Sequence, residues 1–336
     1  MEARSLEPIR TAVVGLGRMG LDHHCSVLSR LEQFDLVAGC DATPARRQTA
    51  EEKHGMATYE SIQLMLASEN IEFVTIATPS SMHHAHVLEV LAAGKHCLTD
   101  KPPAMNTAEW DEMGEAACKA GVTLCCYQNA RWNPHQRAAM AATADGRVGR
   151  VEAVKLMYIG YSTVMRTYGV TDYRPQWRAE RRFGGGILYD FGPHHFDRVM
   201  QVVGAARPVS VYCRLASRSW SDEVDDGFLA VITFDDGVVA HIEHDTATRA
   251  DLSTYIVVGS DATVQDGVLR TGEPGALVEE KVEIPEATAD EYHLALYEHI
   301  RHGAPSPVPW EHTRRVMVLL DAAFESARTG EAIRVG

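Results

Sequence analysis

The chain has 336 residues, of which 45% are hydrophobic and 23% charged, a globular composition that excludes a disordered or collagen-like chain and, at this length, predicts two domains. Its 46 Asp and Glu against 32 Lys and Arg give a formal net charge of −14. Because such a surface repels phosphate backbones and no basic patch interrupts it, we expect no nucleic-acid partner, whereas a neutral small molecule remains a suitable ligand.

The cysteines and the apolar segments indicate the cellular compartment. The seven cysteines are scattered and form no C-x-x-C pair, so we expect free thiols and no metal site of that spacing. The N-terminus lacks the apolar stretch of a signal peptide, and no run of about 18 apolar residues occurs. Together these features predict a cytoplasmic protein without a membrane partner.

Residues 1–127 alternate short apolar segments with amphipathic ones. The expected strands cover about 9–14, 34–39, 72–77, 96–99 and 122–126, and the expected helices cover the segment from a glycine turn to about 31, then 44–54, a short helix from 61, 82–93 and 107–120. Pro44 suits a first helical position, and Gly55 suits the position just after a helix. Repeated strand–helix units with apolar strands predict an α/β domain, a doubly wound parallel sheet covered on both faces.

Residues 128–336 do not continue this alternation of strands and helices. The expected helices cover about 134–144, 193–203, 289–302 and 310–329, and the expected strands cover 151–158, 209–217, 227–234, 238–245, 253–259, 263–270 and 277–284. Asp236-Gly237 predicts a tight hairpin, and strands joined by hairpins are antiparallel. We therefore predict a C-terminal α+β domain with a large, mainly antiparallel, open-faced sheet.

A glycine-rich turn, Gly15-Leu16-Gly17-Arg18-Met19-Gly20, has the pattern G-x-G-x-x-G directly after the first expected strand and opens a helix. Gly15 permits the tight turn, Gly17 lets the backbone approach a pyrophosphate, and Gly20 lets the helix pack close to the strand. The amide groups at the start of the helix then face the anion. In this context the turn predicts a dinucleotide site.

Asp41 supports the dinucleotide and bears on which one is bound. It ends the second expected strand, 24 residues after Gly17, where a carboxylate accepts hydrogen bonds from an adenosine ribose. The same carboxylate repels a 2′-phosphate, so NAD is favoured. Arg46 and Arg47, on the next helix, could reach a phosphate or remain solvated, so NADP stays open.

Several further segments together resemble the glucose–fructose oxidoreductase, inositol dehydrogenase and MocA family (Gfo/Idh/MocA), over most of the chain. They are T-P-x-x-x-H at 78–83, A-G-K-H-C-L at 93–98 leading into D-K-P at 100–102, Q-N-A-R-W at 128–132, G-G-G-x-L-x-D-x-G-x-H at 184–194, and S-A-R-T-G at 326–330. The family has Glu where this chain has Asp100, a carboxylate that keeps the charge but is one methylene shorter, so whether it reaches the same partner is left open.

The resemblance implies a Rossmann domain, a C-terminal sheet used in dimer or tetramer contacts, and hydride transfer between a nicotinamide and a secondary hydroxyl of a sugar, cyclitol or related polyol. Lys101 would contact nicotinamide and substrate and stabilise an alkoxide, and His194 would serve as acid and base, because the ordinary pKa of a histidine, about 6.5, lies near working pH. If Gly192-Pro193 begins a helix, Asp190 lies in the turn before it. Asp190 could then orient either the hydroxyl or the imidazole ring.

The implied site residues form two groups. Those assigned to the cofactor are Gly15, Gly17, Arg18, Met19, Gly20, Asp41, Arg46, Thr78, Pro79, Ser80, His83, Asp100 and Lys101. Those assigned to the substrate are Lys101, Asn129, Arg131, Trp132, Tyr161, Trp177, Asp190 and His194. The long segment 158–183 also carries Tyr168, Tyr173 and Arg178, and its aromatic rings could face a sugar or pack among themselves.

The other histidines are not expected to be catalytic or to bind a metal. His195 is expected to face the sheet. The runs His83-His84-Ala85-His86 and His23-His24 lack acidic or cysteine partners at ligand spacing, so we expect helix faces and no metal. Two alternatives to a dehydrogenase remain: a non-catalytic nucleotide-binding regulator on the same fold, and an enzyme with tightly bound nucleotide that exchanges hydride between two sugars.

Overall fold

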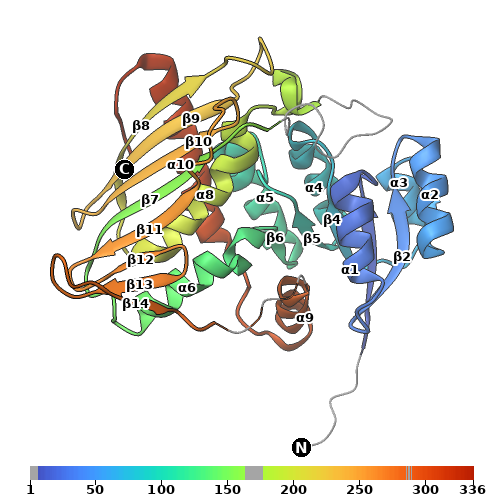
Figure 1. Ribbon diagram of the computed structural model, residues 1–336. Coiled ribbons are helices and arrows are strands. Elements are labelled where there is room, and N and C mark those ends of the chain that lie inside the picture. Colours follow the sequence, from blue (N-terminus) through green and yellow to red (C-terminus); the bar gives the residue numbers. More distant parts are fainter. Residues whose placement is uncertain (1–6, 163–176, 285, 287, 289) are drawn as a thin grey trace, which may run out of the picture.

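The apolar segments of the first 126 residues form one parallel sheet with the strand order β3-β2-β1-β4-β5-β6 (Figure 1). Its strands are β1 Ile9–Val14, β2 Phe34–Cys40, β3 Ala57–Tyr59, β4 Phe73–Ile76, β5 His96–Thr99 and β6 Leu124–Cys126. The computed structural model describes residues 7–162, 177–284, 286, 288 and 290–336. This order is that of a Rossmann fold, in which ligands bind beyond the carboxyl ends of the strands.

The helices between these strands begin and end at the residues that the sequence marks. They are α2 Pro44–His54, α3 Ile62–Ser68, η2 Ser80–Met82, α4 His83–Ala92 and α5 Thr107–Ala120. Gly55 ends α2 in the left-handed conformation, and the side chain of Ser61 accepts a hydrogen bond from the amide of Leu64. β3 was not predicted.

The helix after the glycine turn differs from the expectation. It begins as a π-helix, η1 Arg18–Cys25, and continues as a single α-helical turn, α1 Ser26–Leu28. A π-helix closes its hydrogen bonds over five residues, and spacing of apolar residues does not distinguish it from an α-helix. Such segments are rare and are frequent at functional sites.

The second sheet has nine strands in the order β14-β13-β12-β11-β7-β10-β9-β8-β15. They are β7 Val151–Ile159, β8 Pro208–Ala216, β9 Gly227–Phe234, β10 Val239–Asp245, β11 Thr254–Gly259, β12 Thr263–Gln265, β13 Val268–Thr271, β14 Val278–Lys281 and β15 Ile333–Arg334. All neighbours are antiparallel except β7 and β10. The predicted fold class, a parallel domain followed by a mainly antiparallel open sheet, is confirmed.

One predicted strand is wrong. Residues 263–270 form a hairpin, β12 and β13, because Asp266 and Gly267 adopt φ values of 50° and 87° between them. Two consecutive residues with positive φ make the turn type that Asp-Gly favours. The pair is the same dipeptide as Asp236-Gly237, so the sequence contains a turn signal within this apolar segment.

Helices cover one face of the large sheet (Figure 1). They are α6 Pro134–Ala144, α8 Ile187–Val203 and α10 Trp310–Thr329, and α6 follows the short η3 Asn129–Trp132. α10 contacts β8 of the large sheet and also α5 and β6 of the small one, so the two sheets share a core. The rings of Trp110 and Trp310 stack across this junction with centroids 6.0 Å apart.

α8 begins six residues earlier than expected, at Ile187 rather than Pro193. Asp225, far along the chain, accepts a hydrogen bond from the amide of Leu188 at 2.7 Å, and its carbonyl accepts one from Ile187. This distant cap satisfies amides at the helix start, and Pro193 therefore lies inside the helix. Asp190 consequently belongs to the first turn of α8 and not to a turn before it.

The chain returns to the first domain near its end. α9 Glu291–His302 places Tyr292, Leu296 and Tyr297 in the same apolar cluster as Ile9 and Val13 of β1. The predicted start of this helix, Ala289, lies outside the described residues. The division at residue 127 stays a prediction, and hydrophobic contacts cross it. Within the described ranges, no helix has the length and apolarity needed to cross a bilayer.

Candidate active site

A cavity of about 420 Å3 lies where the parallel strands end. Residues that follow β1, β2, β4, β5 and β6 form one wall, and residues of α8 form the facing wall. The site is therefore built at the carboxyl edge of the sheet, as in other open α/β sheets.

The glycine turn forms a cradle at one end of this cavity. Gly15 has φ +88°, and a Cβ there would lie 2.7 Å from the carbonyl oxygen of Ala77. A Cβ on Gly20 would lie 1.7 Å from the carbonyl oxygen of Gly15, so only glycine allows this approach. Gly17 lines the cavity, and a Cβ there would lie 3.5 Å from its nearest neighbour, Nη1 of Arg46. The turn thus leaves room for a pyrophosphate.

Asp41 follows β2 and lines the same end of the cavity. Its two carboxylate oxygens accept hydrogen bonds from the amides of Leu16 and Thr43, both at 2.8 Å, and its Oδ2 lies 3.6 Å from Nη1 of Arg46. The glycine cradle and this fixed carboxylate are the features that a dinucleotide requires, so the residues present fit that cofactor.

At the other end of the cavity, Lys101 and Asp190 form an ion pair. Nζ of Lys101 donates to Oδ1 of Asp190 at 2.6 Å and also to its backbone carbonyl. Nε of Arg178 donates to Oδ2 of Asp190 at 3.0 Å. Burial alone would raise the pKa of Asp190, but the two cations hold it well below its ordinary value, so the carboxylate is ionised. Asp190 therefore positions two cations, and it makes no hydrogen bond to an imidazole of any described residue.

His194 lies one helical turn after Asp190 on α8, so both side chains reach the same cavity. Within the part of the chain that the structure describes, its ring makes no hydrogen bond, and Nδ1 is buried. Burial, with the Lys101 ammonium nearby, holds the pKa of His194 well below its ordinary value. The ring is therefore neutral and able to accept a hydrogen bond from a ligand.

The neighbouring histidines have structural partners. Nε2 of His195 lies 2.8 Å from Nδ1 of His244 on β10, which confirms that His195 faces the sheet. The two ring nitrogens of His83 lie 2.8 Å from the carbonyl oxygens of Pro102 and Thr78, so this ring joins the loops after β4 and β5. Among the described residues, no three His, Cys, Asp or Glu side chains gather as a metal-binding group.

Most of the residues expected at the site line this cavity. Those assigned to the cofactor that do so are Gly15, Gly17, Arg18, Met19, Asp41, Arg46, Thr78, Pro79, Ser80, His83, Asp100 and Lys101. Those assigned to the substrate that do so are Lys101, Asn129, Trp177, Asp190 and His194. Gly20 lies behind the turn. His86, from the histidine run expected on a helix face near the cofactor, also lines the cavity. Tyr127 and Phe191 line it too and were not predicted, although Tyr127 directly follows the last strand of the sheet.

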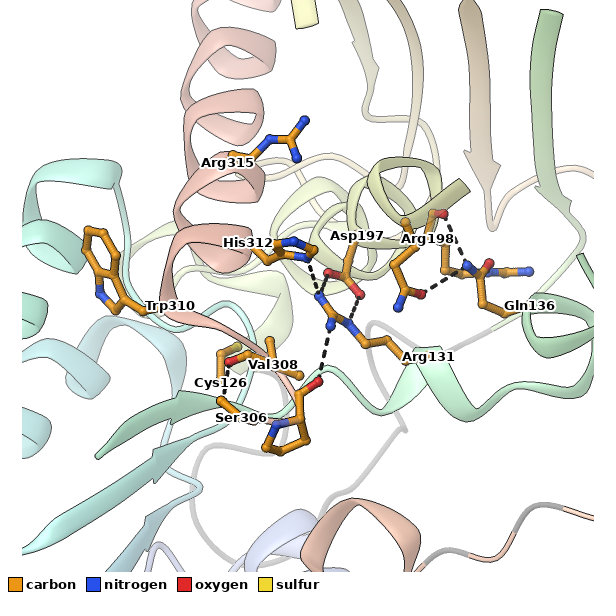
Figure 2. Close-up of polar contacts among 12 residues, drawn as sticks. Cys126, Arg131, Gln136, Asp197, Arg198, Ser306, Val308, Trp310, His312 and Arg315 are labelled. Atoms are coloured by element: carbon orange, nitrogen blue, oxygen red, sulfur yellow. Dashed lines mark hydrogen bonds and ion pairs between the residues drawn. The ribbon is translucent and has the colours of Figure 1, made fainter. Parts of the chain in front are cut away.

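Arg131, which the sequence placed among the substrate residues, does not line this cavity. Its guanidinium forms two hydrogen bonds to Asp197 of α8, at 2.6 and 2.8 Å, and a third to the carbonyl of Pro307 at 3.2 Å (Figure 2). Both side chains of the ion pair are buried, with 8% and 1% exposed. The guanidinium is therefore held away from the cavity by a carboxylate 66 residues along the chain.

Trp132 and Tyr161 also lie away from the cavity. The Trp132 ring packs against Tyr292 of α9 with centroids 5.2 Å apart, because it belongs to the apolar cluster under that helix. Tyr161 is half exposed and packs against Trp220, just beyond the end of the central strand β7. Tyr168 and Tyr173 lie outside the described residues.

Comparison with known proteins gives matches over the whole chain. A family model for the NAD-binding Rossmann fold of an oxidoreductase family matches residues 9–128, and the model for the C-terminal alpha/beta domain of the same family matches residues 142–335. D-glucoside 3-dehydrogenase of Escherichia coli is 26% identical, with 99% of both chains covered. The scyllo-inositol 2-dehydrogenase (NADP(+)) of Bacillus subtilis is 25% identical, with 98% of this chain and 97% of the relative covered. The crystal structure of an NAD-binding protein from Listeria innocua superposes with a TM-score of 0.86 at 24% identity, covering 98% of this chain and 97% of the other.

Proposed function

The chain belongs to the Gfo/Idh/MocA family of oxidoreductases, and from this premise we propose that it is an NAD(P)-dependent dehydrogenase acting on a secondary hydroxyl of a sugar, cyclitol or related polyol. The observation that carries the proposal is His194. Its neutral ring has no hydrogen-bond partner among the described residues and lines the cavity together with the Lys101–Asp190 ion pair. An unpaired buried ring nitrogen costs stability unless a ligand uses it.

The proposed chemistry divides between hydride and proton. When bound, the nicotinamide supplies the acceptor or donor of the hydride. His194 accepts the proton of the substrate hydroxyl and returns it in the reverse direction. The Lys101 ammonium, fixed by Asp190, stabilises the alkoxide as its charge develops. Both groups are already placed before substrate binds, so little reorganisation is needed.

The expected substrate class is supported by the relatives and by the cavity wall. Two relatives covering nearly the whole chain carry names of dehydrogenases that act on a glucoside and on an inositol. In this chain the Arg178 guanidinium lies 4.3 Å from the centre of the Trp177 ring, and both residues line the cavity. A flat aromatic face suits the apolar side of a sugar ring, and a guanidinium donates to hydroxyls or a carboxylate. A non-catalytic regulator would not need an ammonium, a carboxylate and a neutral imidazole together in one cavity, as Lys101, Asp190 and His194 are here.

The direct test is a panel of sugars, cyclitols and sugar acids, with NAD+ and NADP+ in turn, followed by nicotinamide absorbance. We expect reduction of the nicotinamide with at least one polyol. Tight NADH binding without turnover on any member of the panel would favour the regulator. Nucleotide carried through purification, with activity only when two sugars are present, would favour the hydride-exchanging enzyme.

The cofactor preference rests on Asp41. We expect Asp41→Ser to raise the ratio of kcat/KM with NADP+ to that with NAD+ by at least about tenfold, or about 1.4 kcal/mol. The reason is that the change removes a carboxylate that repels a 2′-phosphate and leaves the nearby Arg46 to attract one. Asp35→Ser, at the other end of β2, is the matched control, because Asp35 pairs with Arg10 at the surface. An unchanged ratio in Asp41→Ser would show that this carboxylate does not select the cofactor.

The proposal extends to a homo-oligomer, a dimer or tetramer, formed through the uncovered face of the nine-stranded sheet. Side chains on this face alternate with the buried ones and include partly exposed apolar groups, namely Met157, Leu229, Val231, Ile256 and Val258. Lys155, His241 and Glu243 lie on the same face, and such a mixture of apolar and polar side chains is found in contacts between copies of a chain.

A further inference from the structure

Asp100, the residue that departs from the family motif, is the end of a buried chain of polar side chains. It directly follows β5 and precedes Lys101. Its Oδ1 lies 3.2 Å from Nε2 of His24, and Nδ1 of His24 lies 3.3 Å from Nε2 of His293. The three groups come from the loop after β5, the π-helix after the glycine turn, and α9. No local sequence pattern links them.

His24 lies in the last turn of the π-helix η1. In η1, His23 and His24 are adjacent, yet His24 is fully buried against Asp100 while His23 reaches the hydroxyl of Tyr127 at 2.5 Å. The rings of Tyr127 and His24 pack edge to face with centroids 4.7 Å apart. The His24 imidazole is therefore fixed by aromatic contacts as well as by its two polar partners.

The hydrogen-bond chain has one self-consistent direction. Burial holds the pKa of His293 well below its ordinary value, so this ring is neutral and carries a single N–H. Its Nδ1 is buried without a partner among the described residues. If the proton is on Nε2, the unpartnered atom is a lone pair and not an N–H, and His293 donates to His24. Nε2 of His24 then faces Oδ1 of Asp100 as the donor, at 3.2 Å.

The carboxylate of Asp100 is only half used by this chain. Its Oδ1 is held by His24, whereas its Oδ2 accepts no hydrogen bond from any described residue. Asp100 lines the cavity beside Lys101. Burial alone would raise the pKa of Asp100, but His24, His83 and Lys101 lower it below its ordinary value, so the group is an anion. Because Oδ1 is already held in place, Oδ2 of this carboxylate can accept a hydrogen bond from a hydroxyl or amide group of a ligand in the cavity.

The resemblance places Asp100 at the cofactor, and we infer that His24, backed by His293, is the positioning residue that fixes this carboxylate with Oδ2 toward the bound dinucleotide. The inference rests on the proposed function, because it takes the cavity to be the dinucleotide site. It assigns a role to a histidine that sequence reasoning placed on a simple helix face. It also explains how a carboxylate shorter than the family's Glu is held in place.

The test is a double-mutant cycle on NADH binding, followed by nicotinamide fluorescence without substrate. We expect His24→Leu to raise the Kd for NADH about tenfold, and His24→Gln, whose amide can still donate, to stay within about threefold of wild type. Asp100→Asn should also raise the Kd about tenfold. In the Asp100→Asn background, His24→Leu should add less than about twofold, because His24 acts through the carboxylate.

Two controls separate positioning from general damage. His299→Leu removes a hydrogen-bonded histidine of α9 that does not line the cavity, and it should leave the Kd within about twofold. Thermal melting of every variant reports folding, and His24→Gln keeps the test usable if His24→Leu does not fold. An unchanged Kd in His24→Leu, a poor Kd in His24→Gln, or multiplied effects in the double variant would overturn the inference.

The outcomes also separate this inference from the proposed function. A wild-type protein that binds neither NADH nor NADPH overturns both. A wild-type protein that binds NADH but oxidises no polyol overturns the dehydrogenase alone, and the cycle still decides the role of His24.

Discussion

Replacing His194 with Asn is expected to lower kcat/KM for an active polyol by about 10²–10⁴-fold, the usual contribution of a positioned acid–base group. Asn has nearly the same size but cannot take up the hydroxyl proton. Lys101→Met, which keeps the length of the side chain and removes the ammonium, is expected to cost about 10²–10³-fold. Steady-state kinetics on the best substrate of the panel measure both effects.

The two substitutions should act on one transition state, so the double variant should lose far less than the product of the single losses. The matched control is His195→Asn, since His195 is buried next to His194 but bonds His244 of the sheet. It should retain turnover within about tenfold. Near-normal turnover in both His194→Asn and Lys101→Met would reject the assigned site.

The pH dependence of the wild-type enzyme provides a second check on His194. Burial and the Lys101 ammonium lower the pKa of His194 well below its ordinary value of 6.5. In the free enzyme the ring is therefore still neutral at pH 6.5. A base with a lowered pKa loses activity only as the pH falls through that lowered value. For alcohol oxidation, kcat/KM should therefore show no loss from His194 between pH 8 and 6.5.

The parallel sheet and its helices could be predicted from the sequence because short local patterns specify them. The apolar strands, the glycine turn with Gly15, and helix ends such as Gly55 depend on neighbouring residues only. The start of α8 depends instead on Asp225, which caps the amide of Leu188 from 37 residues away. Local sequence therefore placed the helix start at Pro193, a common first helical residue.

The candidate site divides in the same way. Lys101, Asp190 and His194 lie in segments with a family pattern, and the structure brings them to one cavity. Arg131 lies in such a segment too, but its direction is decided by a buried partner that no short pattern contains. The contacts of Asp100 with His24 and His293 could not be predicted for the same reason. His293 is 193 residues away, and the spacing of apolar residues around His24 does not distinguish a π-helix from an α-helix.

Replacing Arg131 with Ala is expected to destabilise the protein by about 3–5 kcal/mol, because it leaves the carboxylate of Asp197 buried without its partner. The ion pair joins η3, directly after the parallel sheet, to α8, the helix that carries Asp190 and His194, as well as to the link before α10 (Figure 2). Urea unfolding and thermal melting measure the loss. Because both side chains of the pair are buried, solvent screens little of this penalty.

The chain contains a matched control for this prediction. Arg314 also makes two hydrogen bonds to a carboxylate, that of Asp111, at 2.7 and 2.9 Å, but these side chains are 44% and 34% exposed. Arg314→Ala should therefore cost only about 0–1 kcal/mol. If Arg131 instead bound substrate, Arg131→Ala would raise the substrate KM and leave the unfolding midpoint at the wild-type value. Equal and small stability losses in both variants would contradict the structural role of Arg131, because only burial distinguishes the two pairs.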